Sequence, residues 1–230
     1  GKNVMLGPGV NIYRTPLNGR NFEYMGEDPY LSGRMVIPYI EEVQRQGVAT
    51  CVKHYALNDQ EDNRHHVNVN VDDRALYELY LPAFKSAVTE AGTWSIMGAY
   101  NRYKGQFACH NHTLLVDILR NEWGFDGAVI SDWGGCLNTD EAIHNGLDLE
   151  FGSWTNGLTE GASNAYDMYY LAEPYKKLIK ESQCNLSGSK KIDIPKPELY
   201  VIYLGKTKIG KKEFSLNEEY FEGKGPIELR

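Results

Sequence analysis

The stretch Gly124-Phe125-Asp126-Gly127-Ala128-Val129-Ile130-Ser131-Asp132-Trp133-Gly134-Gly135 decides the fold class of this 230-residue chain. Its short, apolar, β-branched run lies between glycines, which predicts a buried strand that ends at Asp132. In α/β barrels and open α/β sheets, ligands bind at the carboxyl ends of such strands. Asp132 is therefore a candidate functional carboxylate, and the alternative is that it caps the next helix or turn.

Upstream of this stretch, short apolar runs alternate with segments of helical periodicity. Strands are expected within residues 3–9, 48–52, 94–100 and 128–131, with a further candidate at 147–151. Helices are expected from Ser32, as N-cap, to Gly47, from Asp72 or Asp73 through Ala87 with a kink at Pro82, and from Thr113 to Trp123. Strands that alternate with helices predict βαβ units and a parallel sheet. Because a complete (β/α)8 TIM-type barrel takes about 250 residues, we expect an α/β fold that is part of such a barrel.

This topology brings polar side chains to one rim of the sheet. Successive strand ends carry Arg20, Lys53-His54, Tyr100-Asn101 and Asp132-Trp133.

Composition limits the class of protein. The net charge of −7 disfavours a nucleic-acid partner, and no apolar run approaches a membrane span. The four cysteines lack C-x-x-C spacing, which indicates buried free thiols; this fits a reducing compartment and leaves the location and the oligomeric state open. Those cysteines are Cys51, Cys109, Cys136 and Cys184.

Residues 1 to about 182 resemble the N-terminal barrel domain of glycoside hydrolase family 3, the β-glucosidase family. The resemblance rests on Leu6-Gly7-Pro8-Gly9-Val10-Asn11-Ile12, Gly19-Arg20-Asn21-Phe22-Glu23, Glu27-Asp28-Pro29, Lys53-His54-Tyr55, Tyr80-Leu81-Pro82-Ala83-Phe84 and Val129-Ile130-Ser131-Asp132-Trp133. It implies a retaining β-glycosidase that acts on a carbohydrate without a cofactor.

The same resemblance implies roles for individual residues. Asp132 would be the nucleophile, in the Ser-Asp-Trp motif. The sugar pocket would be lined by Arg20, Lys53, His54 and Tyr100, with Met97 and Trp133 as further members of its wall.

Retaining hydrolysis gives these residue types a chemical reason. One carboxylate attacks the anomeric carbon, and a second carboxyl about 5–5.5 Å away protonates the departing oxygen. If Lys53 and Arg20 lie close to Asp132, they should lower its pKa, while His54 donates to a sugar hydroxyl and Trp133 offers an apolar face.

Each of these residues also has a simpler interpretation. Arg20 could pair with Glu23, Glu27 or Asp28, Lys53-His54 could be an ordinary strand end, and Tyr100 could be a core residue. His65-His66 looks like a metal pair, but adjacent side chains point apart, so we expect no metal site there. Glu61 and Arg64 could form a loop ion pair.

Two parts of the family pattern are missing from this sequence. An acidic sugar-binding residue would precede Gly1, and the acid/base glutamate of most relatives lies on a following α/β sandwich domain. Glu150, Glu160 and Glu173 match no family position. Because general-acid assistance is worth about 10²- to 10⁴-fold, we expect impaired turnover, with a non-catalytic sugar-binding remnant as the alternative.

The last segment differs from the barrel-like part. We expect a first domain at 1–183 and an unrelated, truncated α+β tail at 184–230, which is Lys-rich. Residues 188–191, 195–205 and 216–221 resemble the C-terminal part of a transposase-associated nuclease of the PD-(D/E)XK type. The metal-binding residues of such nucleases would lie upstream of this piece, so the tail receives no catalytic residue.

Overall fold

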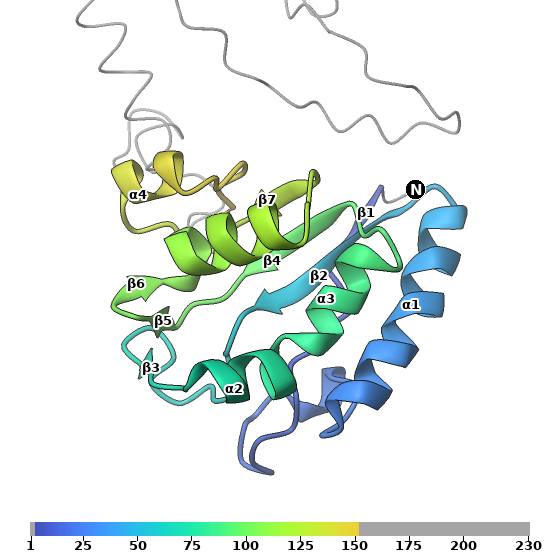
Figure 1. Ribbon diagram of the computed structural model, residues 1–230, viewed down its shortest axis with the longest axis horizontal. Helices are drawn as coiled ribbons and strands as arrows, with labels where there is room; N and C mark the ends of the chain where they lie inside the picture. The colour runs from blue at the N-terminus through green and yellow to red at the C-terminus, as the bar shows by residue number, and fades with distance from the viewer. Residues whose placement is uncertain (1–2, 152–230) are drawn as a thin grey trace, which may run out of the picture. The chain divides into compact units, whose positions relative to one another are not determined.

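A four-stranded parallel sheet organises residues 3–151, the part of the chain that the computed structural model describes (Figure 1). Its strands are β1 (Val4–Met5), β2 (Ala49–Tyr55), β4 (Ser95–Gly98) and β7 (Ala128–Ile130), in the order β1-β2-β4-β7. All three neighbouring pairs are parallel, and spatial order follows chain order. This arrangement is the one that successive βαβ units produce, and it is consistent with part of a TIM-type barrel.

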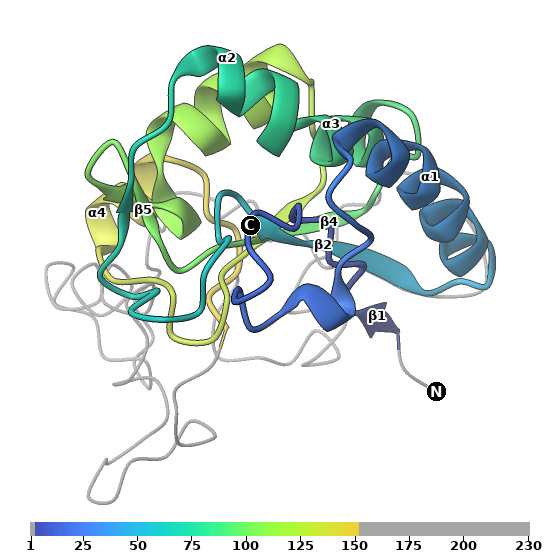
Figure 2. The ribbon, with the colours of Figure 1, turned by 90° about the horizontal axis from the view of Figure 1, so that it is seen from below.

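Helices connect these strands and lie along one face of the sheet. Figure 2 shows α1 (Pro29–Arg45), α2 (Asp73–Ala75) and α3 (Pro82–Thr89) as an arc beside β2 and β4. A π-helical segment, η2 (Leu76–Tyr80), joins α2 to α3, and a second one, η4 (Thr113–Glu122), leads from β4 towards β7. Smaller elements complete the described part: η1 (Asn21–Glu23), β3 (Asn68–Val69), β5 (Arg102–Tyr103), β6 (Gln106–Phe107), η3 (Ala108–His110) and α4 (Thr139–His144).

The two faces of the sheet bury different side chains. Val52, Ile96 and Val129 stand in register on adjacent strands and belong to the large core under the helices. Met97 and Ile130 also stand in register, and with Cys51 they form a separate cluster. Because successive strand residues point to opposite faces, this second cluster marks the face away from the helices. In a barrel that face is the interior.

The start of α1 corrects one prediction. Ser32 was expected to cap this helix, but Asp28 is the N-cap, and its carboxylate accepts a hydrogen bond of 2.8 Å from the Leu31 N–H. Pro29 takes the first helical position, where its missing N–H costs nothing. Ser32 is instead buried inside the first turns. Gly47 follows the helix with φ +76°, as its predicted stop requires.

The expected helix from residue 72 to 87 is present with a break. Asp72 caps it, as predicted, by accepting from the Ala75 N–H at 2.7 Å. Pro82 does not sit inside one continuous helix; it starts α3 directly after the π-helical segment. A proline lacks the N–H that a helix interior needs, so the ladder restarts there.

The remaining predicted elements are partly matched. The expected strand at 94–100 is shorter and spans Ser95–Gly98. In the candidate piece 147–151, Leu149 pairs with Ile130 as an isolated parallel bridge. The predicted boundary at 183/184, the tail and Cys184 lie outside the described residues. Within residues 3–151, no helix is both long and apolar enough to cross a membrane.

Candidate active site at the carboxyl ends of the strands

Asp132 lies two residues beyond β7, and its residue is 8% exposed. Its Oδ1 accepts the Trp133 backbone N–H at 2.7 Å, while its Oδ2 lies 3.6 Å from His54 Nε2. One carboxylate oxygen therefore stabilises the local turn and the other faces a side chain from a different strand. The contact with the Trp133 N–H fits the interpretation of Asp132 as a turn-stabilising residue, and its role as a functional carboxylate stays a prediction.

His54 comes from the end of β2 and is 1% exposed. Asn11 holds its backbone from both sides: the Asn11 Oδ1 accepts the His54 N–H at 2.8 Å, and the Asn11 Nδ2 donates to the His54 carbonyl at 3.1 Å. The His54 Nδ1 lies 3.1 Å from the Tyr24 hydroxyl. Burial, followed by the positive charges of Arg20, Lys53 and Arg64, lowers the pKa of His54 well below its usual value, so the ring is neutral.

Glu23 connects the two predicted cations. Its carboxylate accepts from Arg20 Nε at 2.6 Å and lies 3.0 Å from Lys53 Nζ. The pairing of Arg20 with Glu23 was one of the simpler interpretations, and it is confirmed. Burial acts to raise the pKa of Glu23, but hydrogen bonds from Lys53 and Arg20 outweigh it and leave that pKa lowered.

A second glutamate continues this network. Glu61 accepts from Arg64, as the predicted loop ion pair, and lies 3.9 Å from an Arg20 guanidinium nitrogen. We call the set Arg20, Glu23, Lys53, Glu61 and Arg64 the charged cluster.

Tyr100 joins this network to Asp132. Its hydroxyl donates to the Trp133 carbonyl at 2.7 Å and also interacts with the Asp132 carboxylate. The Arg64 guanidinium lies over its ring at 4.4 Å, and the His65 ring centroid is also 4.4 Å away. Tyr100 is thus buried, as a core residue would be, and its hydroxyl lies beside the Asp132 carboxylate; its part in lining a sugar pocket stays a prediction.

The electrostatics correct the expectation for Asp132. Arg20 and Lys53 were expected to hold its pKa down, yet its pKa is raised, because burial outweighs everything that favours the anion. The Trp133 N–H, the Tyr100 hydroxyl, Arg20 and Arg64 all lower it, in that order, without reversing the direction. Lys53 and Arg20 both contact Glu23, which competes with Asp132 for their charge.

The two weaker members of the predicted wall have different environments. Met97 is 2% exposed and packs with Cys51 and Ile130 on the face of the sheet away from the helices. Trp133 is 41% exposed, and its ring lies 5.1 Å from that of Phe151. Trp133 therefore has indole surface free for a ligand, whereas Met97 lies in the cluster beneath.

Sequence reasoning missed several residues of this site. Tyr24 received no role, Glu23 and Arg64 were considered only as ion-pair partners of Arg20 and Glu61, and His65 was considered only as a metal ligand and rejected. Tyr24, Arg64 and His65 lie outside the helices and strands, and Glu23 ends the short 3-10 helix η1. The sequence signal for these four residues was the concentration of charged and aromatic side chains around them. A sequence pattern alone does not show which strand a loop side chain will contact.

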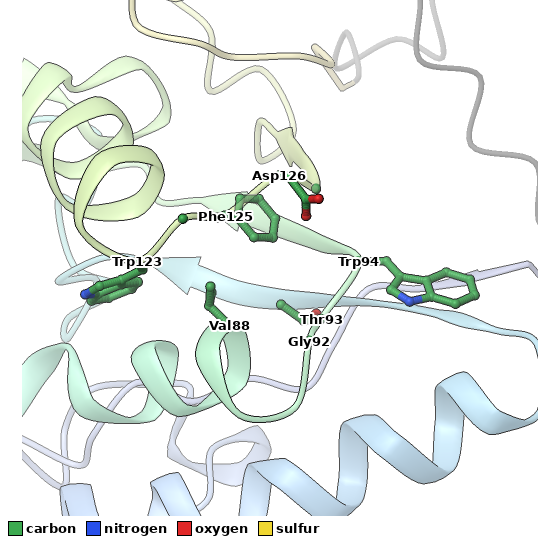
Figure 3. A pocket seen from close by; sticks show the side chains of 9 residues that line it. Val88, Gly92, Thr93, Trp94, Trp123, Phe125 and Asp126 are labelled. Atoms are coloured by element: carbon green, nitrogen blue, oxygen red, sulfur yellow. The ribbon is translucent and has the colours of Figure 1, made fainter. Parts of the chain in front are cut away.

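A hollow of about 390 Å³ lies at the opposite ends of the strands (Figure 3). It is lined by residues that directly precede β4 and β7, among them Trp94 and Asp126, and by Val88, Trp123 and Phe125. None of the predicted site residues lines it. In parallel α/β folds chemistry takes place at the carboxyl ends of strands, so this hollow is not the candidate active site.

Cys51, Cys109 and Cys136 are buried free thiols, and burial raises the pKa of Cys51 and of Cys136 to about 12. Among the described residues 3–151, no three His, Cys, Asp or Glu side chains are grouped as a metal ion requires.

Comparisons with known proteins show which family the chain resembles in sequence and fold. The chain is 60% identical over 182 residues to a β-glucosidase of Bacteroides ovatus, covering 79% of this chain and 24% of that protein. It is 52% identical over 147 residues to an exo-α-(1→6)-L-arabinopyranosidase of Bifidobacterium longum, covering 64% and 19%. The structure of β-glucosidase 3B from Thermotoga neapolitana in complex with α-D-glucose matches with a TM-score of 0.69 and 40% identity, over 80% of this chain and 25% of that one.

The chain thus spans about a quarter or less of the length of these relatives. The sequence profile of the glycosyl hydrolase family 3 N-terminal domain matches residues 1–150. With that match over most of its length, and an α/β fold with a parallel sheet, this chain belongs to glycosyl hydrolase family 3.

Proposed function

We propose that residues 3–151 carry the nucleophile half of a retaining β-glycosidase site, with Asp132 attacking the anomeric carbon of a sugar. The observation that carries this proposal is the position of Asp132: a buried carboxylate at the carboxyl end of a strand, 3.6 Å from a neutral histidine and within the field of Arg20 and Arg64. A nucleophilic carboxylate must be ionised and oriented, and these groups supply both.

The reaction proceeds in two displacements. Asp132 bonds to the anomeric carbon as the glycosidic C–O bond breaks, and water then hydrolyses the glycosyl-enzyme. The departing oxygen needs a proton from a second carboxyl, and within residues 3–151 we assign none: Glu23 and Glu61 already form ion pairs in the charged cluster. We therefore expect this chain to act best on glycosides whose leaving group departs without protonation.

The sugar is held by side chains around Asp132. Arg20 and Lys53 offer charged donors, His54 a neutral donor, Tyr100 a hydroxyl and Trp133 an apolar face, over the floor that contains Met97. Arg64, which lies over the Tyr100 ring, joins them as a further donor. Charge-assisted hydrogen bonds of this kind are about twice as strong as neutral ones.

The substrate class follows from the named relatives. β-Glucosidases are among the most similar proteins, so we propose a β-glucoside as the substrate. Similarity to an arabinopyranosidase makes an L-arabinopyranoside the second choice, because both sugars present a pyranose ring.

Covalent trapping tests the proposal. A 2-deoxy-2-fluoro glucoside with an activated leaving group reacts without a proton donor, and mass spectrometry of the digested chain should find the label on Asp132. Asp132→Asn should abolish labelling, whereas Asp126→Asn, an exposed carboxylate at the other end of the same strand, should leave it unchanged. Binding of glucose without any label would refute the nucleophile and support a sugar-binding remnant instead.

A further inference from the structure

The two ring nitrogens of His54 face two different groups. Nε2 lies 3.6 Å from the Asp132 carboxylate, and Nδ1 lies 3.1 Å from the hydroxyl of Tyr24. Both side chains are inside the protein, with His54 1% and Tyr24 5% exposed. Each ring nitrogen therefore has a defined protein group as its neighbour, and both contacts are shielded from solvent.

Only one protonation pattern of His54 satisfies both contacts. With the proton on Nε2, the N–H points at the Asp132 carboxylate and the Nδ1 lone pair accepts the Tyr24 O–H. With the proton on Nδ1, the Nε2 lone pair would face the carboxylate lone pairs, which is repulsive. A doubly protonated ring is excluded because burial and three neighbouring cations lower the pKa of His54.

Tyr24 is held firmly enough to serve as this donor. Its backbone carbonyl accepts the Tyr13 hydroxyl at 2.7 Å, and its ring meets His54 edge-on, with centroids 6.2 Å apart. Gly9 makes room for the ring: a Cβ there would lie 2.7 Å from Tyr24 Cδ1. Burial raises the pKa of Tyr24, so its hydroxyl keeps the proton that it donates.

We propose that Tyr24 is a positioning residue, whose hydroxyl donates to Nδ1 and thereby fixes His54 as the Nε2–H tautomer, oriented towards Asp132 and the bound sugar. This deepens the proposed function and rests on it. At 3.6 Å, Nε2 is just beyond hydrogen-bond distance from Oδ2. The N–H is thus available to a sugar hydroxyl that enters between them.

Nitrogen-15 NMR of the full chain with labelled histidine tests the contact directly. The signals of His54 are identified by their loss in His54→Asn. We expect a donor-type Nε2 and a hydrogen-bonded, acceptor-type Nδ1, and in Tyr24→Phe the Nδ1 signal should move towards that of an unbonded acceptor. A protonated Nδ1 in the native chain, or an Nδ1 signal that does not move in the variant, would overturn the proposal.

The labelling reaction supplies the functional readout. Tyr24→Phe should slow covalent labelling about tenfold, the effect of one buried hydrogen bond. Tyr77→Phe, which removes an exposed tyrosine hydroxyl bound to Glu122, should leave the rate unchanged. Equal rates for the native chain and Tyr24→Phe would refute the positioning role. If no chain is labelled, the nucleophile proposal fails, while the NMR result still decides whether Tyr24 donates to Nδ1.

Discussion

Glu23→Gln tests whether the charged cluster stabilises the fold or is only a chance grouping of charges. Glu23 accepts from Arg20 at 2.6 Å and lies 3.0 Å from Lys53, and the three side chains are only 16–22% exposed. Glutamine keeps the shape but removes the negative charge, so two cations lose their shared counter-ion. Breaking a fully buried pair costs about 3–5 kcal/mol and an exposed pair about 0–1 kcal/mol. At this intermediate burial we expect a loss of about 2–3 kcal/mol in the free energy of unfolding.

Urea unfolding at pH 7 measures this loss. The matched control is Glu42→Gln, which breaks the Glu42–Arg45 pair on α1, where the side chains are 64% and 67% exposed. That control should leave the unfolding midpoint unchanged, because water screens the pair. If both variants unfold at the same urea concentration, the charged cluster does not stabilise the fold and the reasoning is refuted.

The same substitution has a pH signature. The pKa of Glu23 is lowered in the folded chain, so its contribution to stability is present above the ordinary glutamate pKa of about 4.3 and is lost as the pH falls through the lowered value. The difference between the native chain and Glu23→Gln should therefore shrink in acid. A difference that stays constant down to acid unfolding would contradict the lowered pKa.

Three further predictions follow from the same structure. Because the pKa of Asp132 is raised, the rate of covalent labelling should rise with pH through a midpoint above that of an ordinary aspartate, about 3.9, and a midpoint at or below that value would contradict this. Burial raises the pKa of Asp59 to about 7, so its neutral form stabilises the fold in acid and that stabilisation is lost as the pH rises; Asp59→Asn should therefore stabilise the chain at pH 8 by up to about 4 kcal/mol, and by less at pH 5, in urea unfolding. In Gly98→Ala the new Cβ would lie 2.7 Å from the Cys109 Cα, and the overlap should lower the free energy of unfolding by about 1–3 kcal/mol; an unchanged melting temperature would refute it.

Much of the sheet could be predicted because each strand is marked by a short run of apolar residues in the sequence. β7 was expected from a β-branched run between glycines, and β2 from the run that ends at Lys53-His54. The position of Asp132 beyond its strand followed from the same pattern. The prediction for the start of α1 was wrong: Ser32 was expected as its N-cap, and the N-cap is Asp28. The Asp28-Pro29 pair was the better signal, since proline favours the first helical position.

The site could be predicted only in part because half of it comes from loops. His54, Tyr100 and Asp132 each lie near a strand end, and topology brings strand ends together, whereas Arg20 directly precedes η1, 15 residues after β1 ends at Met5. Glu23, Tyr24 and Arg64 lie in segments without periodicity, and no local rule places a loop side chain against a strand 30 or more residues away, as Tyr24 is placed against His54. The sign of the Asp132 pKa shift was missed because burial, which raises that pKa, is the largest of its causes and cannot be read from a local sequence pattern.

The balance of charge around Asp132 gives this arrangement a chemical consequence. In the charged cluster, three cations face two glutamates, which leaves one net positive charge, and two of these cations, Arg20 and Arg64, act on Asp132. An ionised Asp132 therefore neutralises the group, which favours the reactive anion, while burial opposes it and keeps the pKa raised. A carboxylate held this way is poorly solvated, and its anion is therefore more reactive towards carbon than that of an exposed aspartate. Removing Glu23 would increase the positive charge and lower the pKa of Asp132, which gives a more stable and therefore weaker nucleophile.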